Sequence, residues 1–352
     1  MDIRAIVEDY GLDELQQGIE VLFPKRAFEL DDLLSQVLSG DVFGALAYLF
    51  EGSITDVLNQ LFSLRDVFIW LLMMGIIASV MTHFVEIFDK NQVADLSFYF
   101  MYLLFIVVLL KCFGQAFDVA FQTIENIVMF VKLLVPVYLI TVGISAGTVT
   151  AAVSYQLMLI VVCGVEYILS AGLLSLIHSY VMLCIVNGIW VEEKLTLFIR
   201  LVKRFIGWVL KGALGVVTGI SIFQTLITPI VDSAGRSALK GFVSAIPGVG
   251  GAANSVTELV LGSAILIRNS VGVVLLMLLL LLCAFPLLKI ALIAGMLKCA
   301  AAFMGVVSDR KLTACVDKVG EAGFLLFKTT GTAMLLFIIS IAVTAALGRG
   351  IS

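Results

Sequence analysis

The sequence predicts an all-α protein, a polytopic bundle of transmembrane helices with an N-terminal amphipathic helical region. Hydrophobic residues make up 61% of the 352-residue chain, and charged residues only 14%, against about 25% in soluble domains. A soluble fold of this length cannot bury so much apolar side chain, so a small water-soluble enzyme is excluded. The apolar runs are continuous rather than alternating, which excludes a transmembrane β-barrel.

Charge is distributed unevenly between the two ends of the chain. Residues 1–66 hold 13 acidic and 4 basic side chains, a balance of −9, whereas residues 67–352 hold 13 acidic and 18 basic ones, a balance of +5. The chain therefore divides into an acidic head, 1–66, and a multi-pass membrane body, 67–352. Neither part has the dense Lys/Arg stripe of a nucleic-acid binder, so no nucleic-acid partner is expected.

Apolar residues at helical spacing predict three short helices in the head. The first ends near Pro24, the second begins around Leu30 and is broken at Gly40, and the third runs from Val42 to Phe50. They would lie on the membrane surface, bind a partner helix or form a small self-packed cap. The first residues have no basic segment followed by an apolar core, so no secretory signal peptide is expected.

Long apolar runs in the body predict the membrane crossings, since about 20 apolar residues are needed to span a bilayer. The predicted spans are 67–88, 96–113, 124–144, a long run at 149–190, 205–228, a second long run at 271–307, and 322–346. Each long run would form a helix of roughly 55 Å, nearly twice the hydrocarbon thickness. Breaks are therefore expected at Ser170-Ala171-Gly172 and at Pro286, which gives about seven to nine crossings.

Two short basic loops predict the orientation. Residues 191–204 and 308–321 are rich in Lys and Arg, so both should be cytoplasmic. Counting spans from these loops places the acidic head and the C-terminus outside the cell membrane.

A weak internal repeat relates the same two loops. Residues 188–196 and 305–313 align at an offset of 117, which also pairs Lys211 with Lys328 and one long apolar run with the other. We expect candidate repeats at 145–228 and 262–346, as in a parallel duplication that puts both loops on one side. Chance similarity in a biased composition is the alternative.

The most informative polar stretch is a Gly/Pro loop at 232–258. It is followed by an apolar segment, 259–267, that is too short to span a bilayer. This pattern is typical of a re-entrant half-helix whose backbone lines a cavity, although an ordinary external loop would look similar. The candidate pore or re-entrant-loop residues are Pro247, Gly248, Gly250, Gly251, Asn254, Glu258 and Arg268.

Isolated charges inside predicted spans are costly and should face a cavity or find a partner. The candidates are Lys132, Glu166, Lys211 and Lys289. Glu166 with Lys132 or Lys289 is the expected buried pair, whereas Lys298 lies near a span end and should snorkel. Gly215 and Gly219 form a small-xxx-small motif, which predicts close helix packing.

No enzyme signature is found: the chain has no nucleotide-binding GxxxxGK[ST] loop, no HExxH and no GxSxG. The six cysteines show no metal-ligand spacing and there are only two histidines, so we expect no catalytic residues, no metal and no cofactor. Energy for any transport would come from an ion gradient or from a partner.

The stretch 245–264 (AIPGVGGAANSVTELVLGSA) resembles the stage III sporulation protein AE family of endospore-forming bacteria. The resemblance continues through Ile267 to Gly272, the segment around Pro286 and Lys289, and 307–311. Members of the family commonly begin with a signal peptide. Here the start is either trimmed, or the head crosses without a cleaved signal.

The resemblance implies a component of a channel complex in the mother-cell membrane around the forespore. Its expected partners are the lipid bilayer, a cytoplasmic secretion-type ATPase, ring-forming and small membrane proteins, and a forespore-side partner. The role would be that of an export platform or permease, required for forespore development. A self-sufficient secondary transporter that couples ions through Glu166 or Glu258, and a structural scaffold, are the alternatives.

Overall fold

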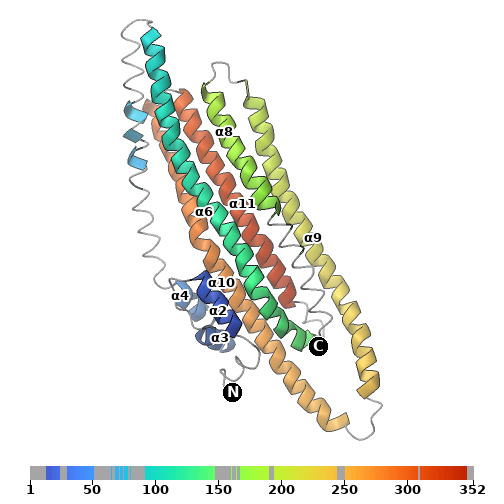
Figure 1. The fold of residues 1–352 in the computed structure, drawn as a ribbon. Coiled ribbons are helices and arrows are strands. Elements are labelled where there is room, and N and C mark those ends of the chain that lie inside the picture. Colours follow the sequence, from blue (N-terminus) through green and yellow to red (C-terminus); the bar gives the residue numbers. More distant parts are fainter. Residues whose placement is uncertain are drawn as a thin grey trace.

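A computed structural model describes residues 13–23, 30–50, 65, 68–70, 72–73, 75–77, 80, 92–146, 160, 164, 167–189, 194–243, 250–307 and 310–346. All elements in this part of the chain are helices, arranged as an elongated bundle (Figure 1). The short ones are α2 (Asp13–Leu22), α3 (Leu30–Leu38) and α4 (Val42–Phe50). The body contains α6 (Gln92–Ala146), the short π-helix η1 (Tyr167–Leu174), α8 (Ser175–Ile189), α9 (Thr196–Val243), α10 (Gly250–Val307) and α11 (Arg310–Ala346).

The head helices lie against the membrane body rather than forming a separate cap. Helix α2 packs on α6, whereas α3 and α4 pack on α10, at the lower end of the bundle in Figure 1. Ile19, Leu33 and Leu49 are almost completely buried in this contact region. The apolar positions that predicted these helices are therefore the ones that attach the head to the body.

The turn between α3 and α4 forms where the sequence predicted a break. Gly40 has a φ of 86°, a left-handed conformation that costs glycine nothing and that commonly ends a helix. The amide of Asp41 donates to the Gln36 carbonyl at 2.9 Å. Its side-chain Oδ1 accepts a hydrogen bond from the Gly44 amide at 2.8 Å and so caps the start of α4.

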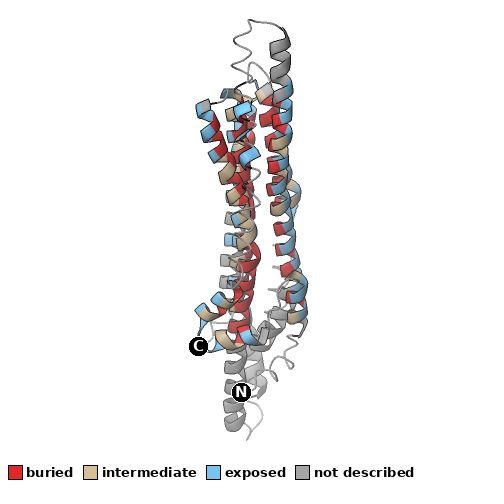
Figure 2. Ribbon diagram, turned by 90° about the vertical axis from the view of Figure 1, so that its left-hand side faces the viewer, coloured by how far each residue is buried: buried red, intermediate tan, exposed pale blue. Residues whose placement is uncertain are grey.

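Three long helices, α6, α10 and α11, form the core of the body, since each packs along the other two. On α6 the buried residues recur every three or four positions, as at Phe105, Leu109, Ala116 and Ala120, which is the spacing of helices packed nearly parallel. Figure 2 shows buried residues along much of the length of the bundle.

The prediction of two separate spans at 96–113 and 124–144 is wrong. Both lie in α6, which continues without a turn for 55 residues, about 80 Å at 1.5 Å per residue. The intervening residues include Gly114 and Asp118 but no proline, so nothing removes a helical hydrogen bond there. One buried face runs through them, because Ala116 and Ala120 are 1% and 0% exposed.

The second long run forms one helix rather than two. Pro286 lies inside α10, which extends over 58 residues. Proline is tolerated inside membrane helices where neighbouring helices and local adjustment satisfy the freed backbone groups, and α10 has α6 and α11 packed along it. The break predicted at Ser170-Ala171-Gly172 is not a turn: these residues lie inside the π-helix η1, which continues directly into α8.

The region predicted as a loop at 232–258 is largely helical. Residues 232–243 continue α9 and residues 250–258 begin α10, and both parts extend beyond the ends of α6 and α11 (Figure 1). The segment 259–267 is likewise part of α10, so it is not a separate half-helix. The reason is local: apart from Gly235 and Gly241, the helix-breaking residues concentrate at 247–251.

The two aligned segments lie where two helical hairpins turn, α8–α9 and α10–α11. The predicted loops 191–204 and 308–321 are nevertheless wrong for most of their length, because residues 196–204 belong to α9 and residues 310–321 belong to α11. Both turns lie at the same end of the bundle, opposite the head and the last described residues of α11 (Figure 1). The orientation relative to a membrane that the charge pattern predicted stays a prediction. The internal duplication itself stays a prediction.

Four helices in the described part of the chain are long and apolar enough to cross a membrane: Tyr102–Leu133, Tyr167–Gly188, Ser270–Val306 and Arg310–Ala342. The predicted count of seven to nine is not reached there. The first predicted span, 67–88, is described at only a few positions.

Candidate functional site: an interhelical polar cluster above an apolar pocket

The described part of the chain brings a polar cluster together where α8, α9 and α11 meet. The Tyr180 hydroxyl of α8 donates a hydrogen bond to Glu321 Oε2 of α11 at 2.8 Å. The Lys203 ammonium of α9 forms an ion pair with Glu321 Oε1. One carboxylate therefore joins three helices, and it uses a different oxygen for each neighbour.

The cluster is partly accessible to solvent, with 31% of the Glu321 side chain and 43% of the Lys203 side chain exposed. Its charges are compensated by pairing, which is how ionisable groups are kept in membrane segments. Tyr180, by contrast, is 1% exposed, so its hydroxyl depends on Glu321. These three residues hold α9 against the rest of the bundle.

A second polar contact fixes the nearby α8–α9 turn. Asn187 is completely buried; its Nδ2 donates to Thr196 Oγ1 at 3.3 Å, and its Oδ1 accepts from the Leu195 amide at 2.8 Å. Both ends of the side-chain amide are thus satisfied, as burial requires. The hairpin is therefore closed by side-chain hydrogen bonds in addition to chain connectivity.

A further ion pair joins α10 and α11. Lys298 Nζ lies 2.6 Å from Asp317 Oδ1, so Lys298 has a specific partner rather than the snorkelling position predicted. The stem of Lys298 packs closely on Gly320, where a Cβ would meet Lys298 Cγ at 3.2 Å. The glycine allows the close approach of the two helices at this level.

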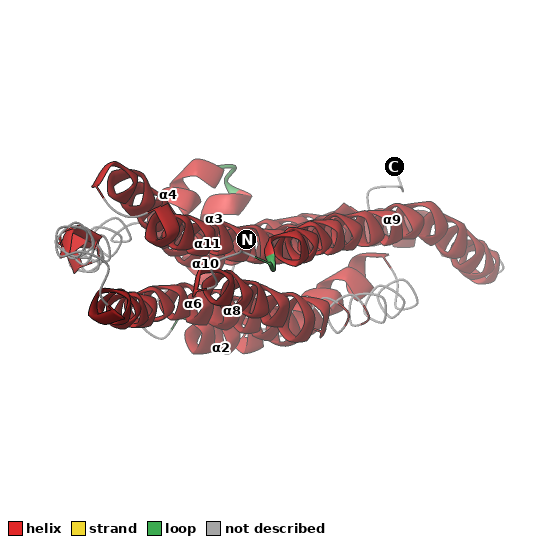
Figure 3. Cartoon of the chain, turned by 90° about the horizontal axis from the view of Figure 1, so that it is seen from above, coloured by secondary structure: helices red, strands yellow, loops and turns green. Residues whose placement is uncertain are grey.

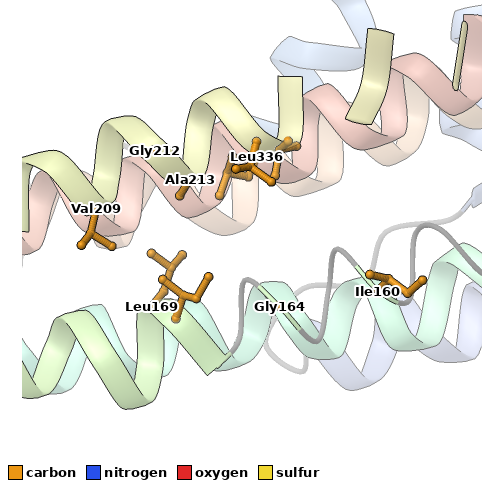
Figure 4. A pocket seen from close by; sticks show the side chains of 10 residues that line it. Ile160, Gly164, Leu169, Val209, Gly212, Ala213 and Leu336 are labelled. Carbon is orange, nitrogen blue, oxygen red and sulfur yellow. The ribbon is translucent and has the colours of Figure 1, made fainter. Parts of the chain in front are cut away.

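Below the polar cluster, α9 and η1 separate around an apolar pocket of about 350 Å³. Figure 4 shows side chains from η1, α9 and α11 facing it. Its lining residues are Ile160, Gly164, Ile168, Leu169, Val209, Gly212, Ala213, Val216, Val217 and Leu336. A cavity of this composition offers an apolar ligand or side chain contact area but no polar group to orient it.

The close packing predicted for Gly215 and Gly219 is not found among the residues that the structure describes. A Cβ placed on either residue would meet no atom within 4 Å. Helix α9 lies at the edge of the bundle (Figure 3), so these glycines have no partner helix in the described part of the chain. The close contacts are instead those of Gly320 and Gly323 with α10.

The other sequence-predicted residues do not converge in the described structure. Lys132 on α6 and Lys211 on α9 are exposed, and Lys289 on α10 is half-buried. Glu166 lies outside the described residues, and so do Pro247 and Gly248, so the predicted Glu166 pair is not tested. Gly250, Gly251, Asn254, Glu258 and Arg268 all lie in the first part of α10, and their role in lining a cavity stays a prediction.

Sequence reasoning missed Glu321, because the last span was predicted to start one residue after it. The usable signal was spacing: Asp317 and Glu321 are four residues apart, on one face of a helix. For Lys203 the sequence predicts only a place among the basic residues of the loop 191–204. No group of three or more His, Cys, Asp or Glu side chains that could hold a metal is found among the described residues.

Comparison with known proteins assigns the family. A family model described as "Stage III sporulation protein AE" matches residues 28–348. The curated relative "Stage III sporulation protein AE" from Bacillus subtilis (strain 168) is 23% identical over 264 residues, which cover 74% of this chain and 66% of the relative. The chain thus spans just under two thirds of that relative's length. No solved structure matches. Because the family model extends from the second head helix to the end of α11, the chain belongs to the stage III sporulation protein AE family.

Proposed function

We propose that this chain is an integral membrane component of a sporulation-specific channel or secretion complex that links mother cell and forespore. It would reside in the mother-cell membrane around the forespore, with the basic hairpin turns in the cytoplasm and the acidic head outside. Its role would be that of an export platform or permease, required for forespore development. The family membership and the four helices able to cross a membrane support this proposal.

The permease-like role is supported chiefly by the surroundings of α9, which has polar contacts at one end and an apolar pocket beside it further along. At the hairpin end, α9 is fixed by Asn187 and by the ion pair of Lys203 with Glu321. Further along, an apolar pocket separates it from η1. A helix that is fixed by polar contacts at one end and borders an apolar pocket further along has room to move relative to its neighbours, as pathway-lining helices of transporters do.

The π-helix on the opposite wall supports the same role. Such stretches are rare and often occur at functional sites, and η1 contributes Ile168 and Leu169 to the pocket. Small residues face each other across the pocket at Gly164 and Gly212. This leaves room for α9 to approach η1.

The proposal is tested by complementation in an endospore-forming host that lacks its own family member. The chain should restore heat-resistant spores and should co-purify with the ring-forming proteins and the secretion-type ATPase. Filling the pocket with Ala213→Phe should lower the spore count about tenfold or more while the protein still accumulates and co-purifies. Val107→Phe, on the exposed face of α6, is the matched control and should sporulate normally.

Two alternatives predict different outcomes. A self-sufficient transporter predicts flux in proteoliposomes of the isolated protein, abolished by Glu258→Gln. A scaffold predicts that Ala213→Phe and substitutions in 245–258 leave sporulation intact, whereas substitutions on assembly surfaces do not. Normal sporulation of the Ala213→Phe variant would therefore overturn the permease-like role.

A further inference from the structure

The first four turns of α9 have two distinct faces. The inward face carries Ile199, Val202, Ile206 and Leu210, each less than 9% exposed. The outward face carries large apolar side chains that remain at least half exposed. These are Leu197, Leu201, Phe205 and Trp208.

Two arginines lie on the outward face as well. Arg200 and Arg204 are four residues apart and therefore on the same side of the helix, and together with the four apolar residues they line an open groove of about 660 Å³. Lys203 points the other way, to Glu321. Among the residues that the structure describes, ion pairs are found for Lys203 and Lys298 but for neither of these arginines. Within the described residues, the groove thus combines the positive charge of two arginines that have no ion-pair partner there with apolar surface.

We propose that this groove, defined by Leu197, Arg200, Leu201, Arg204, Phe205 and Trp208, binds an anionic phospholipid. The two guanidinium groups would hold the phosphate of the headgroup, since arginine presents paired donors that match phosphate oxygens. Leu201, Phe205 and Trp208 would contact the glycerol and upper acyl chains. Tryptophan prefers this depth of a bilayer because its ring is apolar and its N–H is polar.

Two observations favour a lipid over a protein helix as the occupant. The described lining residues all belong to α9 and combine two guanidinium groups with apolar and aromatic side chains, which matches a phosphate headgroup followed by acyl chains. The groove also begins one residue after the start of α9, at the bundle end where both basic turns lie (Figure 1). That end is predicted to be cytoplasmic, and the cytoplasmic leaflet is the one whose anionic lipids attract basic segments.

Quenching of tryptophan fluorescence by brominated lipids tests the proposal on the full chain in nanodiscs. The chain has three tryptophans, so Trp70→Phe and Trp190→Phe leave Trp208 as the probe. Brominated phosphatidylglycerol at a few mole per cent should quench Trp208 more than brominated phosphatidylcholine at the same content. The expected preference is roughly 10- to 30-fold, because each basic side chain near the surface contributes about fivefold.

Arg200→Gln with Arg204→Gln should reduce this preference to about twofold or less, and so should high salt. Arg310→Gln with Lys311→Gln removes two charges from the other hairpin turn and should leave the preference unchanged. Equal quenching by the two lipids would overturn the proposal and leave only general exposure to the bilayer. Absence of quenching by either lipid would also overturn it, because the face would then be covered by protein.

Discussion

Helices α9 and α11 occupy corresponding positions, each being the second helix of a hairpin with its turn at the same end of the bundle, yet they are packed very differently. Helix α11 contacts α6, α8, α9 and α10, whereas α9 packs on α8 and α11. As a result Ala333 and Leu336 of α11 are completely buried, while Trp208 and Val216 of α9 are more than 60% exposed. Similar sequence at the turns therefore does not fix how deeply the following helix is buried.

The space around the glycines of the two helices shows the same difference in packing. A Cβ on Gly323 of α11 would lie 2.8 Å from Ala294 Cβ and 3.2 Å from Ala294 Cα, so no side chain fits. A Cβ on Gly207, Gly212 or Gly215 of α9 would meet nothing within 4 Å. The glycine on α11 allows two helices to pack closely. The glycines on α9 lie on a surface that has room for a lipid, a partner protein or a movement of the helix.

The largest expected effect comes from adding a side chain at Gly323. Gly323→Leu should destabilise the protein by about 3 kcal/mol or more, because overpacking a rigid helix contact forces backbone shifts. Gly215→Leu on α9 is the matched control and should change stability by less than about 0.5 kcal/mol. The midpoint of thermal denaturation in detergent measures both. Equal midpoints for the two variants would contradict the packing difference.

An intermediate effect is expected from enlarging alanines. Ala333→Leu inserts three carbons into a completely buried site and should cost about 1–3 kcal/mol. Ala213→Leu points into the pocket beside α9 and should be neutral or slightly stabilising, because it gains apolar contact. The same thermal measurement compares them, and a loss at Ala213 as large as that at Ala333 would mean that the pocket closes in the native bundle.

The smallest effect is expected at the polar cluster that attaches α9. Tyr180→Phe removes one hydrogen bond to Glu321 and should cost about 1 kcal/mol. Ser179→Ala, one residue away and bonded only to the Ser175 carbonyl of its own helix, should be close to neutral. A double-mutant cycle with Lys203→Met should give a coupling of about 0.5 kcal/mol or more. Additive effects would argue against a shared carboxylate.

Local features of the chain could be predicted because they depend on neighbouring residues. Gly40 and Asp41 end one helix and start the next whatever surrounds them, and Pro24 follows the end of α2 as expected. The turns of the α8–α9 and α10–α11 hairpins fall at the predicted basic loops, although residues 196–204 and 310–321 of those loops are helical. The family resemblance was likewise confirmed.

Features that depend on distant neighbours were predicted wrongly or not at all. Pro286 does not end its helix, because α6 and α11 run along α10. Residues 114–123 do not form a turn, because their small and apolar side chains pack inside the bundle. Glu321 became a candidate only when Tyr180 and Lys203, 141 and 118 residues away, were seen to contact it.

The sequence by itself determined that this protein is an all-helical, highly apolar chain with an acidic head and two basic hairpin turns, because composition and local periodicity are properties of neighbouring residues. Only the tertiary structure decided that α11 lies in the core, that α9 lies at its edge beside a pocket, and that one carboxylate joins three helices. The physical reason is that apolar residues look alike along the chain whether they face another helix or the surface. Only the distance to a neighbouring helix distinguishes the two cases.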